Sequence, residues 1–277
     1  MNLKKSLPYI IAILIFVIAS LLYFSPVLKG QKLNQSDITQ FRGMSKEIVD
    51  YRADKGEEPY WTGASFSGMP AYQVSAYYPN NYIRKVDQLL RFLPRPADYL
   101  FLYFAGFFLL LIALKTGWKL AVLGALSFGF STYLIIIFGA GRNAKAHAIA
   151  YMPMVLAGVL WVFQKRYLLG FVVTALAMAL EINTNHPQMT YYLLFTILLL
   201  GMIWLIDAIQ KKQLRVFFKS VAVVTVAVVL AVGMNATRLM AMKEYADYST
   251  RGKTALTINA DGTSKKLTDG LSKEYIT

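Results

Sequence analysis

The chain has 277 residues, of which 56% are hydrophobic and only 16% are charged, and its mean hydropathy is +0.44. Soluble globular proteins carry about a quarter charged residues, so this composition excludes an ordinary water-soluble globule. The sequence contains no cysteine and two histidines. It therefore excludes disulfide frameworks, zinc fingers, iron–sulfur ligation, thiol nucleophiles and histidine-rich metal cages.

Long apolar runs recur along the chain. A helix of about 20 mostly apolar residues spans the bilayer core of about 30 Å. The first run, which follows Lys4 and Lys5, resembles a signal peptide, but its length and the lack of a small-x-small cleavage motif favour a retained anchor. We predict an all-α polytopic helical bundle of about seven spans, at residues 6–28, 99–114, 120–141, 146–164, 167–180, 182–206 and 220–237.

The net charge of +14, from 29 basic and 15 acidic residues, is partly a topology signal. Basic residues in short connections resist translocation and mark the cytoplasmic side. With the N-terminus inside, the short outer connections carry only Arg142 and Lys145. The inner segments carry ten basic residues: Lys4, Lys5, Lys115, Lys119, Lys165, Arg166, Lys211, Lys212, Arg215 and Lys219. Membrane lipids are thus expected partners, and nucleic acid is not.

The first loop carries two amphipathic patterns. Apolar residues recur every three or four positions from Ile38 to Tyr51, and again over 82–93, where Pro94 and Pro96 follow. Aromatic residues, Gly and Pro between the two patterns predict an ordered loop. In the second helix, the predicted solvent-facing residues are Arg84, Lys85, Asp87 and Arg91.

The spans and charges predict four segments. Residues 1–28 form the first span, 29–97 an outer loop, 98–237 a six-span bundle, and 238–277 an outer tail. The tail is polar and has no closing span, so it is interpreted as the truncated start of further structure.

Asp37 lies near the start of the first amphipathic helix and allows two interpretations. The pattern Asp37-x-x-Gln40 resembles a capping box, in which a side chain near the helix start accepts a bond from free N–H groups. Alternatively, a carboxylate at the membrane–water boundary takes a proton from a hydroxyl or binds a divalent cation. One side chain can serve both purposes.

Two further connections on the predicted outer side carry candidate functional side chains. The Gly-rich turn at 139–147 presents Arg142 and Lys145, which suit a phosphate or, alternatively, lipid head groups. The connection at 181–192 gathers polar side chains between two apolar runs. They indicate a water-facing site or, alternatively, an ordinary interfacial turn after which Pro187 starts the next helix. Its candidate residues are Glu181, Asn185, His186 and Gln188, and Glu181 and His186 are also a candidate pair.

Four segments, in this order and topology, resemble the bacterial YfhO family of membrane proteins. They are 30–41 (GQKLNQSDITQF), 59–62 (PYWT), 67–72 (SGMPAY) and 183–192 (NTNHPQMTYY). That family is similar to the GT-C glycosyltransferases, which move a sugar from a polyprenyl-phosphate carrier to an acceptor on the outer face. The resemblance covers essentially the whole chain and implies a GT-C-like fold. Family members are usually longer, so the chain would be their N-terminal part.

The resemblance also implies a site. Asp37 matches the family's acidic residue early in the first outer loop, as base or metal ligand, and no other cofactor is indicated. The expected partners are a polyprenyl-phosphate-linked sugar and a glycan or polymer acceptor, at the bacterial cytoplasmic (inner) membrane. The leaving phosphate would be held by Arg142 and Lys145, helped by His186, with supporting roles for Glu181, Asn185 and Gln188.

Two other functions fit the same pattern. A carrier or flippase would move a lipid-linked sugar across the bilayer without chemistry, and would need polar residues at mid-depth. A scaffold subunit would bind a partner through its first loop. The polar residues gather at the predicted outer ends of the spans, which favours chemistry at the membrane surface.

Overall fold

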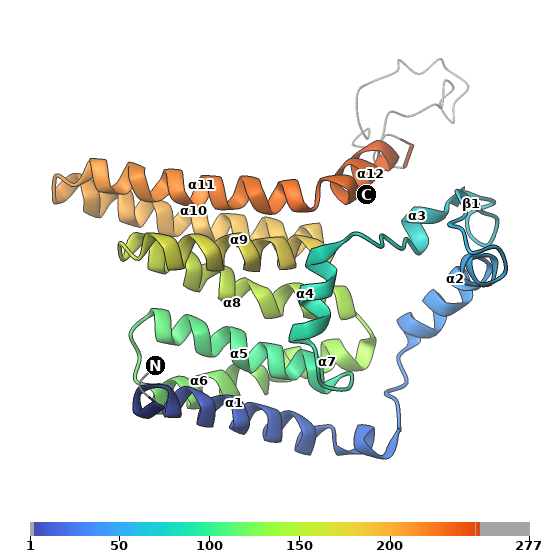
Figure 1. The fold of residues 1–277 in the computed structure, drawn as a ribbon, viewed down its shortest axis with the longest axis horizontal. Coiled ribbons are helices and arrows are strands. Elements are labelled where there is room, and N and C mark those ends of the chain that lie inside the picture. The colour runs from blue at the N-terminus through green and yellow to red at the C-terminus, as the bar shows by residue number, and fades with distance from the viewer. Residues whose placement is uncertain (1–2, 247, 250–277) are drawn as a thin grey trace, which may run out of the picture. The chain divides into compact units, whose positions relative to one another are not determined.

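In the computed structural model, residues 3–246, 248 and 249 are described, and they are mostly helical (Figure 1). The chain divides into two compact units, Met1–Met234 and Asn235–Thr277. The described part of the second unit contains α12 (Ala236–Ala246). Most of the predicted tail, at residues 250–277, lies outside the described residues.

Each predicted apolar run lies mostly on one helix or on a broken pair of helices, although the run 182–206 begins at the end of α9 and the run 220–237 extends beyond α11. In the first run the long helix stops before Pro26, and the 3₁₀-helix η1 (Ser25–Lys29) follows, because proline lacks the N–H that an α-helix needs. The helices are α1 (Leu3–Tyr23), α5 (Ala97–Ala113), α6 (Trp118–Gly129) with α7 (Thr132–Ala140), α8 (Asn143–Phe163), α9 (Tyr167–Asn183), α10 (Pro187–Gln210) and α11 (Leu214–Met234).

Length limits which of these helices qualify as spans. Within the described residues, α1, α8, α10 and α11 are long and apolar enough to cross a membrane, and α6 with α7 makes a fifth if the 44° bend belongs to one span. The helices α5 and α9 have 17 residues each, or about 26 Å at the usual helical rise. The apolar helices indicate a membrane protein, and the count of seven spans stays a prediction.

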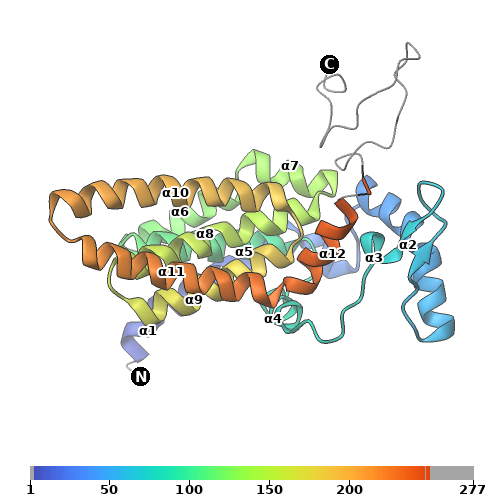
Figure 2. The same cartoon turned by 90° about the horizontal axis from the view of Figure 1, so that it is seen from above.

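The helix α8 lies at the centre of the first unit. It packs against α5 on one side and α9 on the other, and most of its residues are buried. The helices α1, α10 and α11 expose most of their apolar side chains, as expected for surfaces that face lipid. Figures 1 and 2 show α10 and α11 side by side, and Figure 1 shows α1 on the opposite side of the bundle.

The first loop contains helices and a hairpin, with an ordered segment between its two amphipathic helices, as its composition predicted. The helix α2 (Ser36–Lys55) is followed by the antiparallel strands β1 (Trp61–Thr62) and β2 (Met69–Pro70), then α3 (Ala71–Val74) and α4 (Tyr82–Leu90). The Glu47 carboxylate fixes the hairpin, accepting bonds from Thr62 Oγ1 at 2.6 Å and from the amides of Gly63 and Ala64 at 3.1 Å. The two amphipathic segments form the helices α2 and α4.

The orientation of the bundle can be tested with single cysteines, since the natural chain has none. Gly63 is exposed and a Cβ there would meet nothing within 4 Å. If the first loop is outside, Gly63→Cys in intact cells reacts with a membrane-impermeant maleimide, whereas Lys119→Cys, also exposed, reacts only after permeabilisation. The opposite labelling pattern would reverse the predicted topology.

Candidate functional site

The start of α2 lies against the turn between α7 and α8. Gly141 in this turn has φ +82°, a left-handed conformation that favours glycine. A Cβ on Gly141 would lie 3.0 Å from Gln35 Cβ and 3.2 Å from Asp37 Cβ. Two segments about 100 residues apart in the sequence therefore meet, and Asp37 lies beside the turn that carries Arg142.

A pair of buried amides holds this junction. Gln35 Nε2 donates to the Phe138 carbonyl at 2.6 Å and to Asn143 Oδ1 at 3.2 Å, and Asn143 Nδ2 donates back to Gln35 Oε1 at 3.3 Å. These bonds fix the entry to α2 against the first turn of α8. The Asp37 side chain, two residues farther on, is exposed to solvent.

The capping interpretation of Asp37 is wrong. The helix α2 starts at Ser36, its N-cap residue is Gln35, and no side chain makes a capping hydrogen bond there. Asp37 lies within the first turn instead. The Gln35 side chain is engaged with α7 and α8 and is not available as a cap, so the helix start is fixed by tertiary contacts.

A cavity of about 370 Å³ lies at this junction. Its lining includes the buried amides Gln35 and Asn143 and three cationic side chains, those of Lys32, Arg42 and Arg95. None of the described residues that line it is acidic. Arginine and lysine with amide donors make an environment suited to a phosphate or another anion.

Two of the predicted phosphate ligands, Lys145 and His186, form a pair apart from the cationic cavity. The Lys145 ammonium lies 5.3 Å from the centre of the Tyr133 ring. Burial lowers the pKa of His186, and the positive charge of Lys145 lowers it further. His186 Nδ1 is buried without a hydrogen-bond partner among the described residues. Neither side chain lines the cationic cavity, and a neutral His186 adds no positive charge at neutral pH.

The supporting residues of the 181–192 connection lie in local contacts. The fully buried Glu181 carboxylate accepts bonds from Thr190 Oγ1 at 3.0 Å, so it does not pair with His186. Gln188 Nε2 donates to Tyr192 at 2.7 Å, and Asn185 has φ +62° in the turn. The helix α10 starts at Pro187, as predicted. None of these residues lines the cationic cavity.

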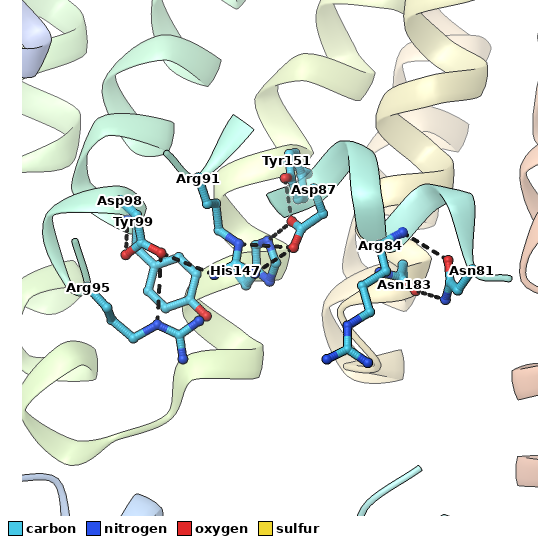
Figure 3. A network of polar contacts seen from close by, with 10 residues as sticks. All are labelled: Asn81, Arg84, Asp87, Arg91, Arg95, Asp98, Tyr99, His147, Tyr151 and Asn183. Atoms are coloured by element: carbon cyan, nitrogen blue, oxygen red, sulfur yellow. Dashed lines mark hydrogen bonds and ion pairs between the residues drawn. The ribbon is translucent and has the colours of Figure 1, made fainter. Parts of the chain in front are cut away.

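A buried polar network lies beside the cavity (Figure 3). The Asp87 side chain on α4 is nearly inaccessible, with 3% of the residue exposed. Its Oδ2 accepts bonds from Arg91 at 2.7 and 2.9 Å, and its Oδ1 accepts one from Tyr151 at 2.7 Å and lies 2.5 Å from His147 Nε2. The prediction that Asp87 faces solvent is wrong, because α4 lies against the bundle and α8 covers this face.

Charge keeps Asp87 ionised. Burial alone would raise its pKa, but the interactions with His147 and Arg91 outweigh burial and hold the pKa well below its usual range. The carboxylate in turn raises the pKa of Arg91 against the opposing effect of burial. The network is thus an internal anion held by the Arg91 guanidinium and by His147 and Tyr151 of α8, which orients α4 on α8.

Asp98 links this network to the cavity. Its Oδ2 accepts a bond from Arg91 at 3.1 Å and lies 3.8 Å from Arg95 Nε. The Arg95 guanidinium also lies 4.8 Å from the centre of the Tyr99 ring. Arg95, which lines the cavity, is therefore positioned by buried residues at the start of α5.

Spacing in the sequence contains a signal for this network. Asp87 on α4 and Arg91, the residue that caps the end of α4, are four residues apart. His147 and Tyr151 are also four residues apart, on α8, so the members of each pair lie on one side of their helix. Nothing in the sequence places these two faces together. The cationic residues Lys32, Arg42 and Arg95 come from three different segments and are likewise united only by the fold.

No family model, curated protein or solved structure matches this chain. The resemblance to the YfhO family therefore stays a prediction from the residues. Function has to be argued from the chemistry of the site.

Proposed function

We propose that this chain is a membrane glycosyltransferase that moves a sugar from a polyprenyl-phosphate carrier to an acceptor at the outer face of the cytoplasmic membrane. One observation carries the proposal: a cavity with three cationic side chains lies at the junction that also holds the exposed Asp37. A phosphate-bearing donor needs the cations, and an acceptor hydroxyl needs a nearby base. Membership of the YfhO family and a GT-C-like fold belong to the same proposal.

In the proposed reaction, the acceptor hydroxyl attacks the anomeric carbon of the donor sugar. A bond forms between the acceptor oxygen and the anomeric carbon, and the bond from that carbon to the phosphate oxygen breaks. The phosphate oxygen takes the electron pair of the broken bond, and the acceptor proton passes to the Asp37 carboxylate. The leaving polyprenyl phosphate gains negative charge, which nearby cations stabilise.

Within this proposal the cavity cations bind the phosphate. Lys32 and Arg42 line the cavity and are exposed to solvent. Arg95 also lines it, and Asp98 and Tyr99 position its guanidinium. Arg142 lies on the Gly141 turn beside Asp37 and is exposed, so it is suited to receive the donor. Lys145 and His186 act farther along the same end of the bundle.

The described residues form no preformed metal site. No three His, Asp or Glu side chains gather as metal ligands in the part of the chain that the structure describes. The proposed mechanism therefore assigns Asp37 as a base and contains no metal-dependent step.

The test separates donor binding from turnover. The protein is reconstituted in vesicles with a labelled polyprenyl-phosphate sugar, and both donor retention and release of polyprenyl phosphate are followed, with envelope glycans supplied as acceptors. We expect Asp37→Asn to retain the donor but to lose turnover by about a hundredfold or more, the scale of a missing general base. Lys32→Gln and Arg42→Gln should each weaken donor retention about fivefold.

A matched control comes from the same helix. Asp50 is exposed and pairs with Lys46, so Asp50→Asn should change neither retention nor turnover. Normal turnover in the Asp37→Asn variant would remove this residue from the mechanism. Movement of labelled lipid-linked sugar across sealed vesicles without a new glycosidic product would instead favour the carrier function.

A further inference from the structure

A second cavity, of about 310 Å³, lies at the end of α8 far from Asn143. It is bounded by the last turns of α8 and α10 and by the first turns of α11. Its aromatic wall contains Phe163 and Trp204, stacked with ring centres 3.9 Å apart, and Phe217, 5.9 Å from Phe163. The cavity is thus separate from the proposed catalytic site.

Ser220 indicates that the cavity takes a polar ligand. Its residue is 1% exposed, its Oγ has no hydrogen-bond partner among the described residues, and it lines the cavity. A buried hydroxyl without a partner costs about 1–3 kcal/mol. Gln164 also lines the cavity, but its amide N–H₂ donates to the Ala113 carbonyl at 2.7 Å. Ser220 is therefore a donor in need of an acceptor.

The charges around the cavity favour an anion. Lys165 lines it, and the one carboxylate in the lining, Asp207, is paired with Lys211 at 2.7 Å. This end carries further cationic residues: Arg166 and Lys212 in the two connections, and Arg215 and Lys219 in the first turns of α11. Basic pockets between transmembrane helices are typical sites for the head groups of anionic lipids.

The surfaces next to the cavity fit the rest of a lipid. On α10, Ile203 and Ile206 are more than half exposed, and on α11 Phe218 is 60% exposed. These apolar faces continue from the cavity along α10 and α11, which bury little of their surface. A ligand with a charged head and long apolar chains would satisfy both the cavity and these faces.

We propose that this cavity binds an anionic phospholipid, with its phosphate between Lys165 and Ser220 and its acyl chains along α10 and α11. The Ser220 hydroxyl donates to a phosphate oxygen and Lys165 supplies the opposing charge. The site does not depend on the proposed glycosyl transfer, because it shares no lining residue with the cationic cavity.

Native mass spectrometry of the purified protein with added phosphatidylglycerol or phosphatidylcholine tests this proposal. We expect phosphatidylglycerol to bind at least fivefold more tightly, and Lys165→Gln to remove most of that preference. Ser220→Ala should weaken the binding of phosphatidylglycerol while leaving the lipid-free protein equally or more stable, because the unpaired hydroxyl is gone. Lys119→Gln, a basic residue outside the cavity lining, is the matched control and should have no effect.

Three results would overturn the proposal. Equal binding of the two lipids would exclude a site for anionic head groups. An equal loss in the Lys119→Gln and Lys165→Gln variants would show attraction to general surface charge. Displacement of phosphatidylglycerol by inorganic phosphate at equal concentration would show a site for free phosphate, in which the acyl chains have no part.

Discussion

Replacing Asp87 by asparagine is expected to destabilise the protein by about 3 kcal/mol, because a buried ion pair loses one partner. Arg91 would keep only Asp98 as a charged partner, and His147 would lose its contact with a carboxylate. The value lies at the low end for broken buried pairs since Asp98 remains. The midpoint of thermal unfolding in detergent measures the loss, and it should fall by roughly 6–12 °C for a chain of this size.

The matched control is Asp50→Asn, which removes an exposed ion pair with Lys46 at the same helical spacing. Exposed pairs of this kind contribute at most about 1 kcal/mol, so this variant should unfold near the temperature of the natural protein. Equal unfolding temperatures for Asp87→Asn and Asp50→Asn would show that the buried network does not stabilise the fold.

The same network predicts a pH dependence. The folded-state pKa of Asp87 lies below its unfolded value of about 3.9. The ionised carboxylate therefore stabilises the protein fully above about pH 4, and this contribution is lost as the pH falls toward the lower, folded pKa. The stability gap between the natural protein and Asp87→Asn should be constant from pH 6 to 8 and should narrow below pH 4. A gap that narrows near pH 6 would contradict this assignment.

Hydropathy predicted the helices because lipid imposes a simple requirement. Each backbone polar group in hydrocarbon needs a partner, so long apolar runs form helices, and α8, α10 and α11 fall where such runs occur. The bend between α6 and α7 was not predicted, since the run from 120 to 141 contains no charge and no proline. It occurs near Gly129, where a Cβ would lie 2.4 Å from the Phe104 ring.

The candidate site was only partly predictable for a different reason. Asp37 and Arg142 were chosen for their residue types and their position near span ends, and the fold brings the segments that carry them together. The bonds that do so, between Gln35 and Asn143, join two neutral amides with no distinctive spacing. Asp87 was misassigned because an amphipathic pattern describes one helix, not what covers its polar face.

Gly158→Val is expected to disrupt the packing of α8 against α9. A Cβ at Gly158 would lie 2.5 Å from Thr174 Oγ1 and 2.6 Å from the Thr174 backbone nitrogen on α9. At Gly170 on α9, a Cβ would lie 2.5 Å from the Val162 backbone nitrogen. Small residues let transmembrane helices approach closely, and because backbone atoms obstruct the new side chain, the helices must separate. The expected cost is about 3 kcal/mol.

Gly201→Val in α10 is the control, since a Cβ at Gly201 meets nothing within 4 Å. Valine is a better helix former than glycine by a few tenths of a kcal/mol, so this variant should unfold at or slightly above the natural temperature. A natural unfolding temperature for Gly158→Val would show that α8 and α9 do not pack at this distance.

The glycine contact also connects the two proposed sites. Asn143, at the first turn of α8, closes the cationic cavity, and Phe163 at its last turn forms a wall of the lipid cavity. A displacement of α8 from α9 would shift both residues, because a helix moves nearly as a rigid rod. Gly158→Val should therefore weaken polyprenyl-phosphate retention and phosphatidylglycerol binding together, whereas Arg42→Gln should affect only the first and Lys165→Gln only the second. If Gly158→Val weakened only polyprenyl-phosphate retention or only phosphatidylglycerol binding, α8 would not couple the two cavities.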